Sequence, residues 1–507
     1  MARLVLPAWV FLALIQPSRA SDLLTGQYNI QRTNADTAEI ILTQSNVAKV
    51  GLLGQWAIDG FSYGQPLLID GGCGTTKALI IATMHNSVYC FDALNPGTAP
   101  VWHVNTGTSM TAYPGDTGFT YGAEIGCWAT PVIDKTAGVV YETCVTSAGI
   151  WKLYSFNLAD GSAFHSPVTV SGTSKGLIFD STRHIQRTDL LLSMGTLYFA
   201  FAGFSDQTPY QGWVMAYDST TLSEVGSWCA VNSLNGQAGI WQGNGGLAAD
   251  SSGHILFSTG NGSWDGANNL GESFVALSSD LSTVVGFATP ANWATLNASD
   301  IDLGSGRLML TGSFAMGGGK DGRWWLMNQS ALGGLQGAGS GPVQEWNALT
   351  VSGSGGAATG IYGGEAFANG TLFLSGVLDK IYSFAFGGSS FTTTATASTL
   401  SSFAFPGATI TYSSNGTDAD SAILWAETVT ANSAHSPQQG TLNALNATTL
   451  AVIKSWSTGI YAKFSAPSVN DGRVYLSTFD NLVSVFGLIP ASQLRGSAAF
   501  RGSGAIR

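Results

Sequence analysis

One short unit recurs along most of this chain: an apolar strand, a tight polar turn, and a second strand that closes on a large apolar residue. Its clearest copy is ALIIATMHNSVYCFDA, which closes at Phe91. Eight closing residues are found, at Phe91, Phe156, Tyr217, Leu277, Met327, Phe384, Leu445 and Phe486. Repeats of this kind are typical of proteins built from small sheets that bury their faces against one another.

A tryptophan stands eleven residues beyond three of these closing residues, at Trp102, Trp228 and Trp456. We expect each indole at the end of a fourth strand, where it can bury roughly 150–250 Å² against the next sheet. A further strand of this type, around Trp56, precedes the first complete repeat, and the last repeat lacks one. Pairing these two ends would leave no free sheet edge.

The sequence therefore predicts an all-β fold, a single β-propeller of eight four-stranded blades closed by an N-terminal strand that pairs with the last blade. Seven blades are the alternative, because the repeat over residues 363–403 matches least well. Turn signals such as Asp160-Gly161 and Asn261-Gly262 separate the expected strands. The predicted boundaries are a propeller over residues 50–487, an N-terminal segment over 21–49 and a flexible tail over 488–507.

The first twenty residues read as a secretory signal peptide. Arg3 precedes the apolar run from Leu4 to Ile15, and Ser18-Arg19-Ala20 offers small residues for cleavage. No later segment is long and apolar enough to span a bilayer. Without Arg3 and Arg19, 18 basic residues face 31 acidic ones. An acidic chain without a basic run is a poor nucleic-acid binder, and we expect a secreted or periplasmic monomer.

Cysteine usage suits an exported protein. Cys73 and Cys90 flank one predicted strand pair, and Cys127 and Cys144 flank another, so each pair is a candidate disulfide. Ordinary buried thiols are the alternative. The odd fifth cysteine is Cys229, and no C-x-x-C motif is present to suggest a zinc or redox site.

Several segments carry a family resemblance. They are residues 124–134 (EIGCWATPVID), 184–187 (HIQR), 239–246 (GIWQGNGG), 296–306 (LNASDIDLGSG), 317–322 (GGGKDG) and 461–469 (YAKFSAPSV). With the repeats, they resemble the pyrroloquinoline-quinone (PQQ) repeat propellers of the quinoprotein alcohol dehydrogenase-like superfamily. Within that superfamily the chain is similar to secreted bacterial proteins with no assigned chemistry.

The resemblance implies PQQ and calcium as cofactors if the chain is an enzyme of that superfamily. Its alcohol dehydrogenases hold PQQ in the propeller axis beside Ca²⁺, use a carboxylate base, and carry a disulfide between adjacent cysteines. This chain has no adjacent cysteine pair, and the spacing from Asp92 to Trp102 is two residues longer than in their motif. The family's calcium ligands and base have no matching positions here.

The segments that lead into the innermost strands contain many of the chain's few polar functional groups, which a propeller would bring together near its axis. These candidate ligand-binding residues are Glu124, His184, Gln186, Arg187, Trp241, Gln242, Asp302, Lys320, Asp321 and Lys463. Such a cluster could bind a small polar ligand, a sugar or an organic acid. The alternative is structural, because buried charges also pair to satisfy one another.

The sequence thus favours a secreted binding module that uses its channel face for a small polar ligand or an envelope or extracellular protein. The alternative function is a PQQ- and calcium-dependent oxidoreductase that acts on an alcohol or a sugar. The sequence assigns no catalytic residue and no metal ligand.

Overall fold

The computed structural model describes residues 22–111, 124–337, 341–353, 355, 359–434 and 436–490. The expected signal peptide, residues 1–20, lies outside the described residues, as do residues 491–507 of the expected tail. Within the described ranges the chain is nearly all β, with a single α-helix, α1 (Trp293–Ala298). None of the helices in these ranges is long and apolar enough to cross a bilayer.

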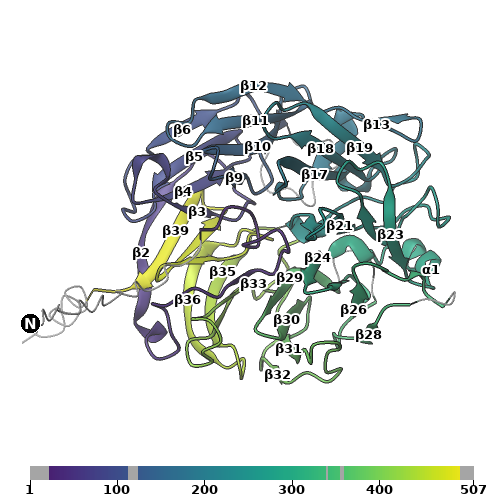
Figure 1. The fold of residues 1–507 in the computed structure, drawn as a ribbon. Coiled ribbons are helices and arrows are strands. Elements are labelled where there is room, and N and C mark those ends of the chain that lie inside the picture. Colours follow the sequence, from purple (N-terminus) through teal and green to yellow (C-terminus); the bar gives the residue numbers. More distant parts are fainter. Residues whose placement is uncertain are drawn as a thin grey trace, which may run out of the picture.

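Eight antiparallel sheets stand around a central axis as the blades of a propeller (Figure 1). From inside to outside, blade 1 contains β3 (Leu67–Asp70), β4 (Lys77–Ala82), β5 (Ser87–Asp92) and β6 (Trp102–Asn105), and blade 2 contains β9 (Val132–Asp134), β10 (Val139–Val145), β11 (Trp151–Asn157) and β12 (Ala163–Thr169). In blade 3 the two short strands β15 (His184–Gln186) and β16 (Leu191–Ser193) both pair with β17 (Thr196–Gly203), which is followed by β18 (Trp213–Asp218) and β19 (Glu224–Cys229). Blade 4 contains β20 (Ala248–Ala249), β21 (Ile255–Ser258), β22 (Phe274–Leu277) and β23 (Val284–Thr289).

The remaining four blades follow the same order. Blade 5 contains β24 (Leu308–Thr311), β25 (Phe314–Gly318), β26 (Arg323–Asn328) and β28 (Gln344–Asn347), and blade 6 contains β29 (Ile361–Ala368), β30 (Thr371–Gly376), β31 (Ile381–Ala385) and β32 (Ala397–Ser398). Blade 7 contains β33 (Thr409–Ser413), β34 (Ile423–Thr428), β35 (Gln439–Asn446) and β36 (Val452–Ile460). Blade 8 contains β37 (Ser468–Asn470), β38 (Arg473–Thr478), β39 (Leu482–Leu488) and β2 (Val50–Ala57). The prediction of eight blades is confirmed, and the weakly matching repeat forms blade 6.

Short elements decorate these sheets. β1 (Ala35–Asp36) lies parallel to β33, and β27 (Gly334–Leu335) lies parallel to β23. Two small hairpins pair β7 (Met110–Thr111) with β8 (Glu124–Ile125) and β13 (Thr173–Ser174) with β14 (Leu177–Ile178). The 3₁₀ turns are Val47–Lys49, Gly72–Gly74, Ser181–Arg183, Phe204–Asp206, Gln242–Asn244 and Leu303–Ser305.

The ring closes as the repeat pattern predicted. β2 pairs antiparallel with β39, with Val50 opposite Leu488 and Trp56 opposite Val483. The last sheet therefore takes its outer strand from the N-terminal part of the chain, and Trp56 completes the set of tryptophans that end blades. Because the closing strand belongs to the same chain, the ring needs no strand from a partner.

The tryptophans of the outer strands join neighbouring blades. Trp102 Nε1 donates to the carbonyl of Leu158 in blade 2 at 3.0 Å, and Trp456 Nε1 donates to the carbonyl of Val50 in blade 8 at 2.9 Å. The ring of Trp228 meets that of Phe257 in blade 4 edge to face at 5.6 Å. Buried rings thus join adjacent sheets, and at Trp102 and Trp456 a hydrogen bond from the indole N–H adds to the contact.

The segment of residues 23–36 crosses the axis and contacts the innermost strands of all eight blades. We call it the axial plug; in Figure 1 its purple trace runs through the centre of the ring. From blade 1 to blade 8, its hydrogen-bond partners include Leu68, Ile133, Leu190, Ala249, Leu310, Phe367, Tyr412 and Val469. Six of these blades are bonded to the plug by main-chain hydrogen bonds, blade 3 by the side chains of Thr25 and Arg32, and blade 8 by the Tyr28 hydroxyl. A single segment therefore ties eight sheets together at one end of the channel.

Arg32 lies at the centre of the axial plug with no exposed surface. Its guanidinium donates to the carbonyls of Leu247 at 2.8 Å, Gly26 at 2.7 Å and Leu190 at 3.3 Å. Burial lowers the pKa of Arg32 to about 10, against the opposing charge of Asp189, so the side chain stays charged at neutral pH.

Four cysteines form two disulfides in this structure, Cys73 with Cys90 and Cys127 with Cys144. The first joins the turn between β3 and β4 to β5 within blade 1, and the second joins the segment before β9 to β10 within blade 2. Cys229 is a free, buried thiol at the end of β19. Burial raises the pKa of this thiol to about 12, which makes it unreactive at neutral pH.

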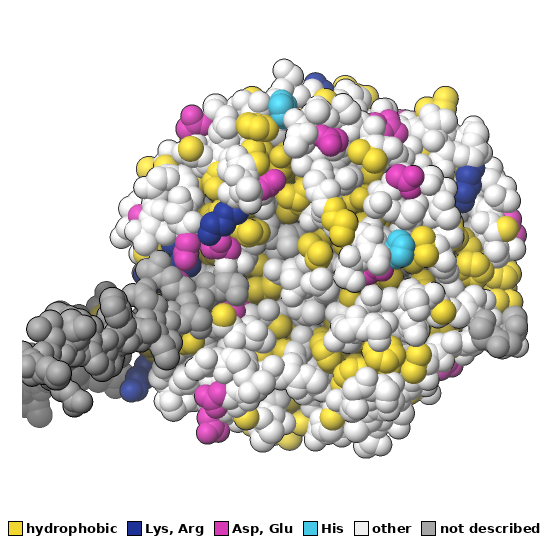
Figure 2. Space-filling model, viewed as in Figure 1, with side chains coloured by type: hydrophobic (Ala, Val, Ile, Leu, Met, Phe, Trp, Pro, Cys, Tyr) yellow, Lys and Arg dark blue, Asp and Glu magenta, His cyan; other side chains and the backbone are white. Residues whose placement is uncertain are grey.

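Charge is sparse over the surface. The face in Figure 2 carries scattered Asp and Glu side chains and few Lys or Arg, while apolar side chains are visible around its centre. This distribution follows from a chain with only 10% charged residues and an acidic excess.

Candidate functional site

A pocket lies in the channel at the end opposite the axial plug. Its free volume is about 80 Å³, and it is lined by residues of blades 2 to 8: Trp128, Ile185, Arg187, Asp206, Trp241, Gly243, Asp302, Ser305, Lys320, Tyr362, Phe405 and Phe464. Strand β29 relates the two ends, because Tyr362 faces the pocket while Phe367 bonds to the plug. Five residues of strand, at about 3.3 Å each, separate the pocket from the plug by roughly 16 Å along the axis.

The pocket is built from equivalent positions in successive blades. Most lining residues come from the segments that lead into the innermost strands, and these strands all run in the same direction. Three of these segments read aromatic-x-x-Pro: Tyr63 before Pro66, Trp128 before Pro131, and Phe464 before Pro467. The rings of Tyr63 and Trp128 stack at 4.3 Å, so neighbouring blades present their aromatic side chains together.

Arg187 stands among aromatic rings. Its guanidinium carbon lies 5.3 Å from the Trp128 ring, 5.5 Å from the Trp241 ring and 5.0 Å from the Phe464 ring. Aromatic faces attract a cation through their quadrupole, and the attraction grows where water is excluded. The three rings thus surround the guanidinium at the wall of the pocket.

Lys320 forms a second charged centre of the pocket. Its ammonium lies 2.5 Å from Asp302 Oδ2 and 3.1 Å from Asp300 Oδ1, and it donates to the Asp300 carbonyl at 3.0 Å. Burial lowers the pKa of Lys320, but the negative charges of Asp302 and Asp300 outweigh it and raise the pKa above its usual value. Asp302 Oδ1 is fixed further by accepting a hydrogen bond from the backbone N–H of Asn261 at 2.8 Å.

Asp206 adds a third carboxylate to the surroundings of Lys320. It accepts from the Tyr210 hydroxyl at 2.7 Å, and part of its surface is open to the cavity. The surrounding chain raises the pKa of Asp206 to about 6, first by burial and then by the charges of Asp302 and Asp300. This carboxyl therefore titrates close to neutral pH.

The structure brings four of the ten sequence-predicted residues to the pocket: Arg187, Trp241, Asp302 and Lys320. Gln186 and Gln242 lie buried beside the channel. Gln186 accepts from the Thr143 hydroxyl, and Gln242 accepts from the Ser258 hydroxyl at 2.6 Å. These two amides bind neighbouring strands to one another.

Three further predicted residues are engaged elsewhere. His184 Nε2 accepts a hydrogen bond from the backbone N–H of Gln211 at 3.1 Å. Burial lowers the pKa of His184 to about 4, which keeps its side chain neutral. Asp321 accepts from Arg323 Nε at 2.7 Å. Lys463 donates to the Ala434 carbonyl at 3.1 Å and lies beside the ring of Phe464.

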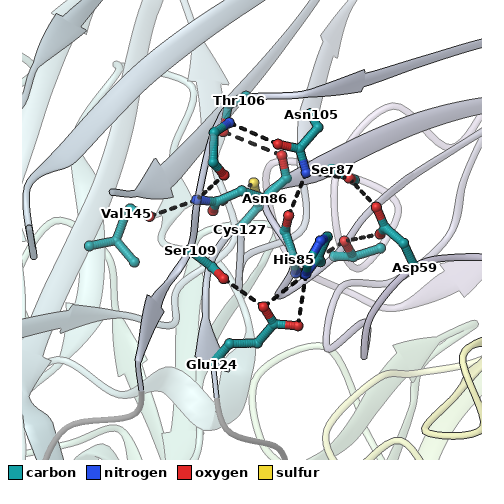
Figure 3. A network of polar contacts seen from close by, with 12 residues as sticks. Asp59, His85, Asn86, Ser87, Asn105, Thr106, Ser109, Glu124, Cys127 and Val145 are labelled. Carbon is teal, nitrogen blue, oxygen red and sulfur yellow. Dashed lines mark hydrogen bonds and ion pairs between the residues drawn. The ribbon is translucent and has the colours of Figure 1, made fainter. Parts of the chain in front are cut away.

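Glu124 belongs to a separate polar network (Figure 3). Its carboxylate lies 2.9 Å from His85 Nδ1 and accepts from the Ser109 hydroxyl at 2.5 Å. Nearby, the Ser87 hydroxyl donates to Asp59 at 2.5 Å. The network joins the β4–β5 turn to β8, and none of its residues lines the axial pocket.

Sequence reasoning did not single out Trp128, Asp206, Tyr362, Phe405 or Phe464, which also line the pocket. The aromatic-x-x-Pro pattern was a usable signal for Trp128 and Phe464. Asp206 comes from the β17–β18 connection, far from any repeated motif, so only the folded ring places it there.

The cofactors of the quinoprotein dehydrogenases do not fit this pocket. A volume of about 80 Å³ is well below the roughly 300–1,000 Å³ of pockets that enclose cofactor-sized ligands. The ammonium of Lys320 already lies between the carboxylates of Asp300 and Asp302. Throughout the described part of the chain, no group of three or more His, Cys, Asp or Glu side chains is placed to hold a metal ion.

Comparisons with known proteins locate the fold. No family model matches the sequence, and no curated protein matches it. Among solved structures, the quinohemoprotein alcohol dehydrogenase ADHIIG from Pseudomonas putida HK5 covers 97% of this chain and 82% of its own at 13% identity, with a TM-score of 0.66. The quinohemoprotein alcohol dehydrogenase from Comamonas testosteroni covers 92% and 80% at 13% identity, with a TM-score of 0.62.

BamB from Moraxella catarrhalis is a third similar structure, with 13% identity, coverage of 86% of this chain and 97% of its own, and a TM-score of 0.50. At such identities the likeness concerns the fold alone. The predicted resemblance to quinoprotein propellers is confirmed at that level: this chain has the propeller fold found in those dehydrogenases.

Proposed function

We propose that this protein is an exported binding module whose axial pocket binds a small polar molecule and recognises an anionic group on it through Arg187. The observation that carries the proposal is the placement of Arg187 among Trp128, Trp241 and Phe464 at the wall of the axial pocket. A few fixed polar groups among apolar walls are the usual composition of a small-molecule site.

Export to the periplasm or the medium is part of the proposal. The sequence of residues 1–20 supports it, and the two disulfides are typical of proteins that fold outside the cytoplasm. We propose a monomer, because β2 closes the ring within one chain.

A quinoprotein oxidoreductase remains the alternative function, and the fold similarity is its support. Against it stand the small pocket volume, the Lys320 ammonium between two carboxylates, and the absence of adjacent cysteines in the sequence. The binding module therefore accounts for the pocket better than the enzyme does.

A thermal-shift screen tests the proposal. Purified protein is heated with sugars, small organic acids, amino acids, or PQQ plus Ca²⁺. A ligand at 100 times its Kd stabilises by about 2.7 kcal/mol, so we expect Tm to rise by roughly 3 °C or more with at least one small acid. Arg187→Gln should abolish the shift, while Lys454→Gln on the exposed face of β36 should keep it.

Two results would contradict the proposal. One is a shift with PQQ and Ca²⁺ together with no shift for any small acid, which would favour the enzyme. The other is a ligand shift that Arg187→Gln leaves intact, since the ligand would then bind elsewhere. Trp241→Phe keeps a ring beside Arg187 and should weaken binding less than Arg187→Gln does. The Trp241→Phe variant therefore serves as the control for a general loss of folding.

A further inference from the structure

Asp206 gives the axial pocket a carboxylate that is not paired with a cation. It ends the 3₁₀ turn Phe204–Asp206 between β17 and β18, and it lines the pocket. Its carboxylate accepts a hydrogen bond from the Tyr210 hydroxyl at 2.7 Å. Within the described ranges, no Lys, Arg or His side chain forms an ion pair with Asp206. When this carboxyl ionises, it therefore adds a negative charge to the pocket without a cation bound directly to it.

The charges around Asp206 make that ionisation costly. The ammonium of Lys320 is bound by other acceptors, the Asp300 carbonyl, Asp300 Oδ1 and Asp302 Oδ2. Burial and the charges of Asp302 and Asp300 raise the pKa of Asp206 to about 6. The hydrogen bond from Tyr210 and the charge of Lys320 oppose this rise, but their effect is smaller. Asp206 thus changes its charge near neutral pH, at the pocket.

Three further titratable groups at the pocket keep their charge state at neutral pH. Burial raises the pKa of the Tyr210 hydroxyl well above its usual value, so Tyr210 stays protonated and donates to Asp206. Burial also raises the pKa of Tyr362, which lines the pocket as a neutral phenol. The raised pKa of Lys320 keeps its ammonium charged. A change of binding between pH 5.5 and 8 therefore does not come from these three groups.

The size of the pocket brings a bound anion close to Asp206. The free volume is about 80 Å³, and a water molecule takes up about 30 Å³ of the liquid, so the space corresponds to a few water molecules. The charge of a ligand in this space lies within roughly 10 Å of the groups that line it. At that distance two like charges, partly shielded from water, repel enough to change an affinity by about tenfold.

Building on the proposed function, we propose that Asp206 determines the charge of the ligand that the axial pocket accepts, and that the pocket binds a small anion together with one proton. The proton comes from the solvent and goes to the Asp206 carboxylate. With Asp206 ionised, the pocket binds an anion weakly. With Asp206 protonated, the repulsion is gone and the same anion binds tightly. The coupling is reciprocal, so the bound anion also strengthens the hold of Asp206 on its proton.

The direction of the pH effect follows from this linkage. In the free pocket the Asp206 carboxyl is half protonated at a pH of about 6, its pKa. In the complex the midpoint lies higher, because ionisation would bring two negative charges together. The affinity for the anion therefore rises as the pH falls from 8 toward 6. It levels off below that pH, where Asp206 is already protonated before binding.

Isothermal titration calorimetry of the full mature protein tests the coupling with two matched probes. Lactate stays ionised between pH 5.5 and 8.0, and lactamide has nearly the same shape but no charge. We expect lactate to bind at least fivefold more tightly at pH 5.5 than at pH 8.0, and lactamide to show no such change. At pH 6.5, titrations in buffers of different ionisation enthalpy should show an uptake of about half a proton per bound lactate.

Two variants identify the group that takes up the proton. Asp206→Asn keeps an oxygen acceptor for Tyr210 and is never charged, so it should bind lactate at pH 8.0 at least fivefold more tightly than the wild type and lose the pH dependence. A misfolded variant cannot produce this gain. Glu272→Gln is the matched control, because Glu272 is buried near Asp302 without lining the pocket, and burial raises its pKa well above the usual value. The pH dependence should persist in this variant.

The outcomes separate this proposal from the proposed function. If lactate binds equally well at pH 5.5 and 8.0, or if Asp206→Asn keeps the pH dependence, the role of Asp206 is wrong and the binding function stands. If Glu272→Gln alone removes the pH dependence, Glu272 takes up the proton and the proposal is wrong. If lactate does not bind even at pH 5.5, the proposal fails, and the wider thermal-shift screen decides the proposed function separately.

Discussion

Three arginines lie near the axis, and their neighbours give them different roles. Arg32 donates to three carbonyls of the plug and adjacent strands, and Arg307 donates to the Gly363 and Glu365 carbonyls. Both are fully buried, and Arg307 also pairs with the Glu365 carboxylate at 3.3 Å. Arg187 alone among these three lines the pocket and stands among aromatic rings. The first two therefore hold blades together, and the third is placed to meet a ligand.

Glu427 is the residue whose pH dependence is easiest to isolate. It lies in β34 with no exposed surface and accepts from the Thr458 hydroxyl at 2.7 Å. Burial raises the pKa of Glu427 from 4.5 to about 8. The folded state then holds the proton more tightly than the unfolded state. The stability this provides is complete below pH 4.5 and is lost as the pH rises through 8.

We therefore predict that Glu427→Gln leaves stability nearly unchanged at pH 5 and raises it at pH 9. The glutamine keeps an acceptor for Thr458 and never ionises. At ~1.4 kcal/mol per pKa unit, the gain at pH 9 is at most about 5 kcal/mol. Urea unfolding at the two pH values measures it, with the exposed Glu224→Gln as the control. A gain of equal size at both pH values would show that ionisation is not its cause.

At the scale of elements, the blades and their closure could be predicted from the sequence, and the plug could not. Each blade repeats a local pattern of strand, turn and large closing residue, and a tryptophan in five of the eight outer strands indicates contact with the next blade. The plug has no such pattern. Its contacts are hydrogen bonds to eight blades far apart in the sequence, made by its main chain to six of them and by side chains to blades 3 and 8. Gln27, Tyr28, Arg32 and Asn34 also adopt positive φ that no turn motif indicated.

The plug makes a testable contribution to stability through Arg32. Arg32→Ala leaves several buried carbonyls without their donor, and removal of one member of a buried charged network costs about 3–5 kcal/mol. We expect the free energy of unfolding to fall by that amount, measured from urea midpoints. Lys454→Ala on the exposed outer strand should change it by no more than about 0.5 kcal/mol.

A small effect of Arg32→Ala would mean that the plug adds little to the ring. The experiment would then place the stability of the propeller in the contacts between blades, such as the Trp102 and Trp456 hydrogen bonds. A result near the expected loss would show that the plug fastens the innermost strands to one another.

At the scale of the whole molecule, the ring determines which residues meet. Four of the ten predicted site residues line one pocket, because the segments leading into successive innermost strands converge on the axis. The sequence alone did not show which of the ten residues would face the pocket and which would point away from it. His184 and Gln186 stand beside Arg187 in the chain, yet alternation along an extended strand turns neighbouring side chains to opposite sides. Asp206 reaches the pocket only because blade 3 is folded.

The fold also limits what similarity can say about function. The propeller of the quinohemoprotein alcohol dehydrogenases is shared at 13% identity, and the architecture is supported by buried rings and backbone pairing that many sequences can supply. What a ligand would meet is decided instead by the side chains of the pocket: Arg187 among its aromatic rings, and Lys320 between two carboxylates.

A crystal structure of the protein grown with the small acid that raises its Tm most tests the central claim most directly. The account predicts that this acid lies in the axial pocket, in contact with Arg187. The acid bound only on the outer surface, or bound in the pocket away from Arg187, would contradict it.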